Sequence, residues 1–188
     1  PAKALLSING IPMIKFLIDS LKNESFKGKF IFATTTNTTD DYLSKYVNSL
    51  AIDVYRGSEH DLVKRYLDIA KKYSLEFIVR VTGDCPFVDF FSLNFCLQQV
   101  NLDEHFDLWT TKNAFPTGID YELININSLS KSWAKMNTFE KEHLTLYFYE
   151  KKSLDKFKIN YFKPPANWSK TQETFTVDTF KDYVKILN

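Results

Sequence analysis

Several kinds of residue are scarce in this sequence, and each scarcity argues against a class of protein. The two cysteines, Cys85 and Cys96, are too few for a disulfide framework or a zinc site, so we expect a reducing compartment and a cytoplasmic location. The formal net charge is only +1, which indicates neither a nucleic-acid-binding surface nor a polybasic membrane contact. No apolar run approaches the roughly 20 residues of a membrane span. The sequence contains no Ser-His-Asp set and no helical HExxH motif, so hydrolase and zinc-enzyme functions have no support.

What the sequence does contain indicates one globular domain. Its 188 residues are 44% hydrophobic and 25% charged, which is ordinary for a soluble protein with a sizeable core. In the first hundred residues, helical and strand periodicities alternate with short connections, which is the pattern of parallel βαβ units. The predicted helices cover 11–23, 38–50, 58–73 and 89–101, and the predicted strands cover 29–35, 51–57 and 76–83.

The second half of the sequence extends the same α/β pattern. Strands are predicted at 107–112, 119–127, 157–163 and 174–178, and helices at 128–136, 138–151 and 179–188. Because there is no internal repeat or linker, we predict a single domain over residues 1–188. A doubly wound sheet should begin with a strand, yet this chain begins with "PAKALLSING", without a methionine or a signal peptide. We therefore expect that its true amino terminus is missing here.

The stretch "VRVTGDCPFVD" (79–89) places carboxylates where a buried strand ends. Asp84 ends this predicted strand, and Asp178 ends another, just before a helix. Open α/β sheets bind ligands at the carboxyl ends of their strands, and Mg²⁺ needs only one or two protein carboxylates besides water and phosphate. The two residues could therefore hold Mg²⁺, with Gly83 letting the backbone pass close to a ligand. Each aspartate, and Asp89 as well, also fits a turn or a helix cap, and spacing alone leaves both interpretations open.

Other polar residues are candidates for binding a nucleotide or a substrate. Lys3 could act as a point charge on a phosphate, or be an ordinary surface lysine. Arg80 lies within an apolar strand, where a charge must be paired or functional. The threonines of "ATTTN" (33–37) suit hydrogen bonds to a base or ribose, and equally a solvated loop. His143, on a predicted helix, could reach a substrate from outside the sheet.

Seven short segments, in order along the chain, match the motifs of a known family. They are "PAKALLSINGIPMI", "FATTTNTTDD", "VYRGSEHDLVKRY", "VRVTGDCPFVD", "FPTGIDYELI", "KEHLT" and "TVDTFKDY". The fourth closely matches the signature Arg-x-Thr-Gly-Asp-Cys-Pro-Leu-Ile-Asp. Together these segments resemble the cytidylyltransferases of bacterial surface-sugar synthesis. Within that family the resemblance is to the spore-coat polysaccharide biosynthesis protein F-like branch, with the CMP-sialic acid and CMP-3-deoxy-manno-octulosonate synthetases as more distant relatives.

The resemblance implies a glycosyltransferase-A-like (Rossmann-like) three-layer sandwich with a mixed, mostly parallel sheet. It also implies Mg²⁺-dependent transfer of CMP from CTP to a small-molecule acceptor, with release of pyrophosphate. By position, Asp84 and Asp178 would be the magnesium ligands, and Lys3 would steady the triphosphate. Around the nucleotide would lie Thr34, Thr35, Thr36, Arg56, Arg80, Thr82 and Gly83. Facing the acceptor would be Asp120, Glu122 and His143. Asp89 is expected to cap the following helix.

One departure from the family pattern leaves alternatives open. Family members begin with a strand and a Gly-Ser-Arg phosphate loop directly before the Pro-x-Lys segment, and these are absent from this sequence. A non-catalytic nucleotide-binding or assembly domain of a larger protein is therefore one alternative. Another is a transferase that uses a different nucleotide or a nucleotide-sugar. The resemblance also leads us to expect a homodimer through the 113–150 region, with no nucleic-acid or membrane partner.

Overall fold

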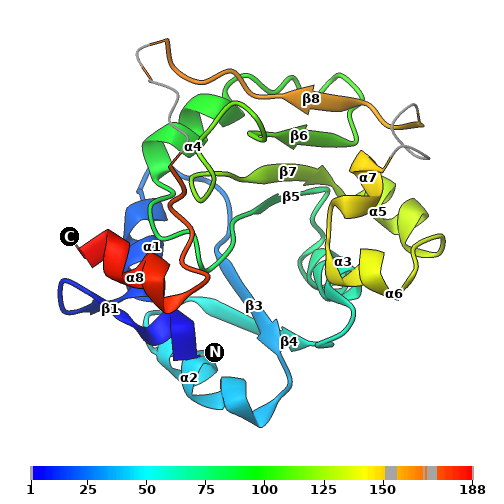
Figure 1. Ribbon diagram of the computed structural model, residues 1–188. Coiled ribbons are helices and arrows are strands. Elements are labelled where there is room, and N and C mark those ends of the chain that lie inside the picture. Colours follow the sequence, from blue (N-terminus) through cyan, green and yellow to red (C-terminus); the bar gives the residue numbers. More distant parts are fainter. Residues whose placement is uncertain (1, 151–155, 167, 169–172, 188) are drawn as a thin grey trace.

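The computed structural model describes residues 2–150, 156–166, 168 and 173–187 (Figure 1). Apart from a short amino-terminal hairpin, its strands form two separate groups. One group is a four-stranded sheet in the order β5-β7-β6-β8. Its strands are β5 (Phe77–Arg80), β6 (Leu108–Thr110), β7 (Glu122–Asn125) and β8 (Ile159–Tyr161). The other group is the pair β3 (Ile31–Thr35) and β4 (Asp53–Gly57). No hydrogen-bonded ladder joins the two groups within the described residues.

The predicted mixed sheet is confirmed, because the four-stranded sheet contains one parallel and two antiparallel pairings. β3 pairs with β4, and β6 with β8, in parallel. β7 runs antiparallel to both of its neighbours, β5 and β6. Because β7 lies between these two strands, Glu122 stands in register with Arg80 on one side and Thr110 on the other. The prediction that parallel pairing predominates overlooked this central antiparallel strand.

Two hydrophobic clusters on opposite faces of the sheet produce three layers. Successive residues of a strand point to opposite faces, and in β7 Leu123 belongs to one cluster and Ile124 to the other. The Leu123 cluster is covered by α1 (Met13–Leu21), α2 (Asp41–Ser49) and α4 (Phe90–Leu97). The Ile124 cluster is covered by α3 (Leu62–Tyr73), α5 (Ile126–Trp133) and α7 (Leu146–Tyr149). Helix α6 (Thr138–Glu142) lies against α3.

Two predicted helices differ from the structure, each for a local reason. The helix predicted from residue 11 begins at Met13, because β1 (Ser7–Ile8) and β2 (Ile11–Pro12) form a hairpin around Asn9-Gly10. Both turn residues have positive φ, +50° and +81°, as tight hairpin turns require. The helix predicted at 138–151 is two helices, α6 and α7, because His143 leaves the helical conformation at φ −114° and ψ 82°. Its last residue, Lys151, lies outside the described residues, as do Pro1 and Asn188.

The strand predicted at 174–178 is wrong. This segment makes backbone hydrogen bonds to two different loops, from Phe175 N to Thr117 O and from Val177 N to Asp84 O, so no single neighbouring strand forms a ladder with it. It leads directly into α8 (Phe180–Leu187). The alternation of apolar residues in "TFTVD" therefore serves two loop contacts rather than a sheet.

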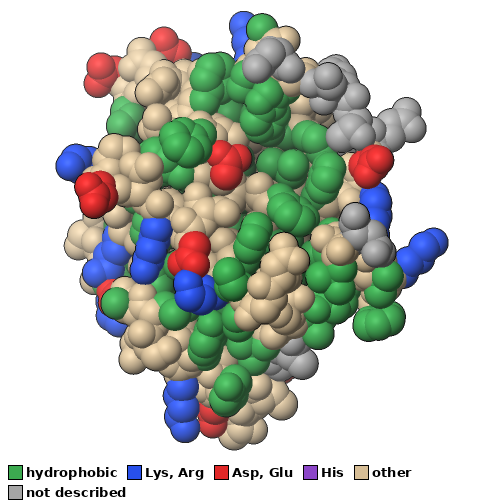
Figure 2. Space-filling view, turned by 90° about the vertical axis from the view of Figure 1, so that its left-hand side faces the viewer, with side chains coloured by type: hydrophobic (Ala, Val, Ile, Leu, Met, Phe, Trp, Pro, Cys, Tyr) green, Lys and Arg blue, Asp and Glu red, His purple; other side chains and the backbone are tan. Residues whose placement is uncertain are grey.

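Hydrophobic side chains also gather on one outer face of the molecule, the left-hand side of Figure 1 (Figure 2). Helices α4 and α8 lie on this side, and their exposed large hydrophobic residues are Phe91, Phe95, Phe180, Val184 and Leu187. In the described part of the chain, none of the helices has the length and apolar character needed to cross a membrane.

Candidate active site

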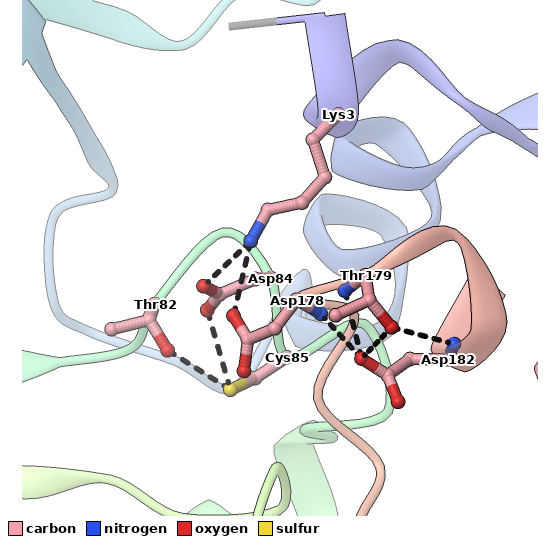
Figure 3. A network of polar contacts seen from close by, with 7 residues as sticks. All are labelled: Lys3, Thr82, Asp84, Cys85, Asp178, Thr179 and Asp182. Carbon is pink, nitrogen blue, oxygen red and sulfur yellow. Dashed lines mark hydrogen bonds and ion pairs between the residues drawn. The ribbon is translucent and has the colours of Figure 1, made fainter.

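One ammonium group joins three segments that are far apart in the sequence (Figure 3). Lys3 Nζ lies 3.1 Å from Asp84 Oδ2 and 3.3 Å from Asp178 Oδ1. Lys3 belongs to the 3-10 helix η1 (Ala2–Leu5), Asp84 follows β5, and Asp178 precedes α8. The structure therefore brings the three predicted catalytic residues together at one place.

The environment of Asp84 keeps its carboxyl group ionised. Burial acts to raise the pKa of Asp84, but the hydrogen bond from Thr82 and the charge of Lys3 outweigh it and hold the pKa below its ordinary value. Burial likewise acts to lower the pKa of Lys3, and the two carboxylates raise it above the usual range. Both groups are therefore charged at neutral pH.

Cys85, next to Asp84, is a buried thiol without nucleophilic character. Its Sγ lies 2.9 Å from Thr82 Oγ1 and 3.6 Å from Asp84 Oδ1. Burial and the nearby carboxylate raise the pKa of Cys85 to about 12. The thiolate, which is the reactive form of cysteine, is therefore scarce at neutral pH.

A close contact at Gly118 holds Asp178 in place. Gly118 has φ +89°, and a Cβ atom built on it would lie 2.3 Å from the backbone nitrogen of Thr176. The adjacent Thr117 carbonyl accepts a 2.7 Å hydrogen bond from Phe175 N, and the Asp84 carbonyl accepts one of 2.9 Å from Val177 N. These contacts place the backbone before Asp178 directly beside Asp84.

Asp182 fixes the other side of Asp178 at the start of α8. Asp182 Oδ2 accepts a 2.8 Å bond from Thr179 N, and Thr179 Oγ1 accepts a 3.2 Å bond from Asp182 N. This reciprocal arrangement caps the start of α8. Asp89 accepts hydrogen bonds from Phe91 N at 2.8 Å and Ser92 N at 3.0 Å, so its predicted role as the cap of α4 is confirmed.

The donor set at Asp84 and Asp178 fits Mg²⁺. One oxygen of each carboxylate already lies within 3.3 Å of the same nitrogen, so a single cation can contact both. The described residues contain no cluster of three or more Asp, Glu, His or Cys side chains suited to a metal. Mg²⁺ does not require one, because it commonly keeps several waters and binds one or two carboxylates together with substrate phosphate.

The threonines expected at the nucleotide are engaged by Asp40. Oδ2 of this buried aspartate accepts hydrogen bonds from Thr34 Oγ1 at 2.6 Å, Thr35 N at 3.0 Å and Thr35 Oγ1 at 2.6 Å. Burial acts to raise the pKa of Asp40, and these hydrogen bonds lower it below its ordinary value. Thr36 is exposed. The nucleotide-binding role of the three threonines stays a prediction.

Arg56 holds the loop that follows these threonines. Its guanidinium donates to Thr35 O at 2.8 Å and Asn37 O at 2.7 Å, and pairs with Asp41 Oδ1 at 2.7 Å. All three contacts fix the path of the chain between β3 and α2. In this structure Arg56 therefore positions the loop, and a direct contact with a nucleotide stays a prediction.

Arg80 and Glu122 form a buried ion pair that joins two predicted groups of site residues. Arg80 Nη1 lies 3.3 Å from Glu122 Oε2, which also accepts from Thr145 Oγ1 at 2.9 Å. Glu122 Oε1 accepts from the Tyr149 hydroxyl at 2.8 Å. Burial acts to lower the pKa of Arg80, but Tyr66 and Glu122 raise it above its ordinary value. The charge within the apolar strand is therefore paired.

The remaining predicted residues occupy separate places. Asp120 accepts a 2.7 Å hydrogen bond from Gly118 N and so supports the loop that contacts Thr176. His143 is exposed, and its ring packs edge-on against Phe139 at 4.5 Å between centroids. A Cβ atom on Gly83 would meet Ile14 at an ordinary 3.8 Å, so no described neighbour requires glycine there.

Sequence reasoning missed Asp40 and Gly118, although both carry part of the site. The first aspartate of "TTTNTTDD" could have been predicted to bind the preceding threonines, since aspartate commonly accepts hydrogen bonds from nearby loop groups. For Gly118, the Pro-Thr-Gly turn signalled a special backbone conformation. Its partner at Thr176 is distant in sequence and could not be identified from a local pattern.

Comparison with known proteins identifies the family. The family model described as cytidylyltransferase matches residues 1–188. The chain belongs to the cytidylyltransferase family. It is therefore a nucleotidyltransferase, for which CTP and a small-molecule acceptor are the substrates. The resemblance inferred from the seven motifs is confirmed.

The cytidylyltransferase is similar to proteins from both archaea and bacteria. It is 34% identical over 184 residues to the uncharacterized protein MJ1063 of Methanocaldococcus jannaschii, covering 96% of this chain and 73% of that protein. It is 29% identical to the spore coat polysaccharide biosynthesis protein SpsF of Bacillus subtilis, covering 99% and 78%. Among solved structures, a cytidylyltransferase from Leptospira borgpetersenii matches with a TM-score of 0.89 and 28% identity, covering 100% and 79%. The CMP:2-keto-3-deoxy-manno-octonic acid synthetase structure, at TM-score 0.68 and 15% identity, supports the fold alone, with 100% and 90% covered.

The Gly118 contact predicts a large difference between two glycine substitutions. Gly10 also has positive φ, but a Cβ atom there would meet nothing within 4 Å, so Gly10→Ala should cost only about 1–2 kcal/mol of backbone strain. Gly118→Ala adds a clash with the backbone at Thr176 and should cost about 3 kcal/mol or more. Urea unfolding of both variants measures the difference. Equal losses would show that this contact does not hold the segment before Asp178.

The Asp40 network predicts a pH-dependent loss of stability. Asp40→Ala should lower the free energy of unfolding by about 2–3 kcal/mol at pH 7, because three hydrogen bonds to a charged group are lost. The folded-state pKa is depressed, so this contribution is complete above the unfolded-state pKa of about 4 and disappears as the pH falls through the lower folded-state value. Asp19→Ala, which breaks an exposed pair with Lys15, is the control and should cost less than about 1 kcal/mol. A loss at Asp40 that is unchanged at pH 2 would contradict the electrostatic origin.

Proposed function

We propose that this cytidylyltransferase transfers CMP from CTP to a sugar, sugar acid or phosphorylated small-molecule acceptor in surface polysaccharide biosynthesis. Pyrophosphate is the second product, and the reaction depends on Mg²⁺. The observation that carries the proposal is the meeting of Asp84 and Asp178 around one cation, the ammonium of Lys3. The name of the similar Bacillus subtilis protein, a spore coat polysaccharide biosynthesis protein, supports a role in polysaccharide synthesis.

Asp84 and Asp178 would hold the magnesium ion. When bound, the ion neutralises charge on the phosphate oxygens of the nucleotide and so favours displacement at phosphorus. Its ligands are already in reach of one another, and Asp84 is ionised at neutral pH, so no proton has to leave before binding. Asp178 is the more accessible of the two, with its side chain 63% exposed against 30% for Asp84.

Lys3 changes partners in this proposal. Without nucleotide its ammonium pairs with both carboxylates and offsets part of their mutual repulsion. Its side chain is 39% exposed and lies on a short 3-10 helix, so it can turn toward a phosphate without unfolding a neighbour. A bound triphosphate would then pair with the Lys3 ammonium, and the carboxylates of Asp84 and Asp178 would be free to hold the metal ion.

The Arg80–Glu122 pair has a positioning role beside the nucleotide. Glu122 receives hydrogen bonds from Arg80, Thr145 and Tyr149, so both of its oxygens already have partners. We assign to Glu122 the task of fixing the Arg80 guanidinium in the wall of the site. Asp120 and His143 are then the groups that we propose to face the acceptor.

We also propose a cytoplasmic homodimer that pairs through residues 113–150. The molar mass from light scattering tests the dimeric state.

Two aspartates of the same motif predict opposite results. Asp84→Asn should reduce pyrophosphate release from CTP by about 100-fold or more, because a metal ligand in the transition state is lost. Asp89→Asn is the matched control, since asparagine caps a helix as well as aspartate does, and it should keep nearly full activity. Activity is measured as pyrophosphate released from CTP against a panel of sugar-acid and phosphorylated acceptors. Full turnover by the Asp84→Asn enzyme would overturn the metal assignment.

Lys3→Met should change two affinities in opposite directions. Binding of Mn²⁺ without nucleotide, followed by electron paramagnetic resonance, should tighten, because the competing ammonium is gone. Binding of CTP, followed by calorimetry, should weaken by about tenfold or more, since a hydrogen bond to a charged group contributes about 1.5–3 kcal/mol. Lys15→Met, which removes an exposed lysine of α1, is the control and should change neither. Weakening of both affinities would indicate that Lys3 only holds the fold together.

The nucleotide is tested separately from the chemistry. A ligand that binds the folded state raises the midpoint of thermal unfolding, so CTP with Mg²⁺ should raise it more than UTP, GTP or a UDP-sugar at equal concentration. A preference for another nucleotide would favour the alternative transferase. Stabilisation by CTP without turnover on any acceptor would favour a non-catalytic nucleotide-binding domain.

A further inference from the structure

The three arginines of the chain lie near the carboxyl ends of β4 and β5, whereas its 21 lysines are spread over the sequence. Arg56 pairs with Asp41, and Arg80 pairs with Glu122. Arg65, near the start of α3, is only 7% exposed, yet among the residues that the structure describes no carboxylate lies within ion-pair distance of it. A buried charge without a counter-ion is costly, so this arginine requires a physical explanation.

Arg65 binds the backbone of the turn that follows β4. Its Nε and Nη2 both donate to Ser58 O, at 3.1 Å and 2.5 Å. Its side chain also packs against Gly57, where a Cβ atom would lie 3.0 Å from Arg65 Cγ. Hydrogen bonds from a charged donor are stronger than those between neutral groups. The guanidinium therefore fixes the orientation of the peptide bond between Ser58 and Glu59.

Fixing this carbonyl also fixes the N–H group of the same peptide bond. The described residues contain no cis peptide, so the C=O of Ser58 and the N–H of Glu59 point in opposite directions. Because Ser58 O faces the buried guanidinium, Glu59 N–H points away from it, and Glu59 is exposed. No described residue accepts a hydrogen bond from Glu59 N. The charge of Arg65 also polarises the carbonyl, which makes this N–H a stronger donor.

A second anchor holds the turn from its other end. Asp61 N donates to Ser58 Oγ at 3.1 Å, and Asp61 Oδ1 caps α3 by accepting from Lys64 N at 2.7 Å. The other carboxylate oxygen of Asp61 accepts a 2.9 Å hydrogen bond from Trp133 Nε1, on α5. The turn between β4 and α3 is therefore tied to two helices, which holds its backbone in one conformation.

This turn lies beside the threonines that are predicted to contact the nucleotide. Because β3 and β4 are parallel, both strands end at the same edge, and Gly57 stands in register with Thr35. Thr36 N donates to Gly57 O at 3.1 Å, which joins the two strand ends directly. Open α/β sheets bind their ligands at this edge. The free N–H of Glu59 thus belongs to the edge where a nucleotide is expected.

We propose that Arg65 is a positioning residue of the nucleotide site, which orients the N–H of Glu59 toward an acceptor atom of the nucleoside part of the ligand. This role rests on the proposed function, because it requires a nucleotide at the ends of β3 and β4. The triphosphate part is assigned to Lys3 and the metal ion, beside Asp84. Loss of Arg65 should therefore affect the nucleoside and leave the phosphates bound as before.

Arg65→Met separates the two parts of the ligand in a binding experiment. Calorimetry with CTP and Mg²⁺ should show affinity about tenfold weaker than in the unaltered chain, since one hydrogen bond contributes up to about this factor. Tripolyphosphate with Mg²⁺, which resembles CTP without its nucleoside, should bind with an affinity changed by less than about twofold. Tm should stay within about 3 °C, because removal of a desolvated charge offsets the lost bonds to Ser58 O.

Two more variants separate charge from geometry. Arg65→Lys keeps the charge but lacks the forked pair of donors, so its affinity for CTP should lie between those of Arg65→Met and the unaltered chain. Lys64→Met is the matched control on the same helix. It removes an exposed cation that pairs with Asp68, and its affinity for CTP should be unchanged.

Amide hydrogen exchange, followed by nuclear magnetic resonance, reports on the contact itself. In the unaltered chain, saturating CTP with Mg²⁺ should slow exchange of the Glu59 amide by about tenfold or more, because the N–H becomes hydrogen-bonded. In Arg65→Met the nucleotide should leave this exchange rate nearly unchanged. A purely structural role of Arg65 would not produce this difference.

Other outcomes contradict the role of Arg65 in distinguishable ways. Unchanged CTP affinity in Arg65→Met would overturn it and leave the proposed function intact. Equal weakening of CTP and tripolyphosphate, together with a large fall in Tm, would show that Arg65 only holds the fold of the whole site. If the unaltered chain binds no nucleotide, the proposed function and the role of Arg65 are both wrong.

Discussion

The pairing of two carboxylates with one ammonium group is the interaction on which the candidate site depends. Asp84 and Asp178 reach the same point from a strand end and from a helix start, and Lys3 lies between them. Without a positive charge there, the two acids would repel one another, and this repulsion would oppose the backbone contacts that hold the segment before α8 beside Asp84. The chain therefore contains its own cation at the place where we propose that a metal ion and a nucleotide bind.

This interaction is supported by contacts that involve the backbone rather than charges. Gly118 comes so close to Thr176 that only a residue without a side chain fits, and the carbonyls of Thr117 and Asp84 each bind one amide of the segment 175–177. The ion pairs of Lys3 with the two aspartates lower the energy of the site, while these close backbone contacts determine its geometry. The two effects are separable in principle, because charge can be screened by salt and a steric contact cannot.

Much of the fold could be predicted because its signals are local. The alternation of helical and strand periodicity located nearly every element, and Asp89 caps α4 as expected. The antiparallel position of β7 could not be read in this way, because strand order follows from packing on both faces and not from the strand's own residues. The segment 174–178 was wrongly predicted as a strand, because its apolar residues alternate as in a strand although its backbone bonds to two different loops. For the site, the strand-end rule identified Asp84, which follows β5. Asp178 was identified from a predicted strand that the structure does not form, and it lies instead just before α8. The hydrogen bonds from Thr34 and Thr35 to Asp40 depend on the geometry of the loop, which the sequence reasoning did not predict.

The buried state of the two cysteines has a practical consequence for biophysical work on this enzyme. Cys85 and Cys96 are both buried, and burial raises the pKa of each thiol. Maleimide dyes and spin labels react with exposed thiolates, so we expect Cys85 and Cys96 to react with them only slowly. A single cysteine introduced at an exposed position outside the predicted site, such as Thr39 or Thr138, would carry a reporter without prior removal of the native pair. Movements of the β3–α2 loop or of α6 on nucleotide binding can thus be followed in an otherwise unaltered enzyme.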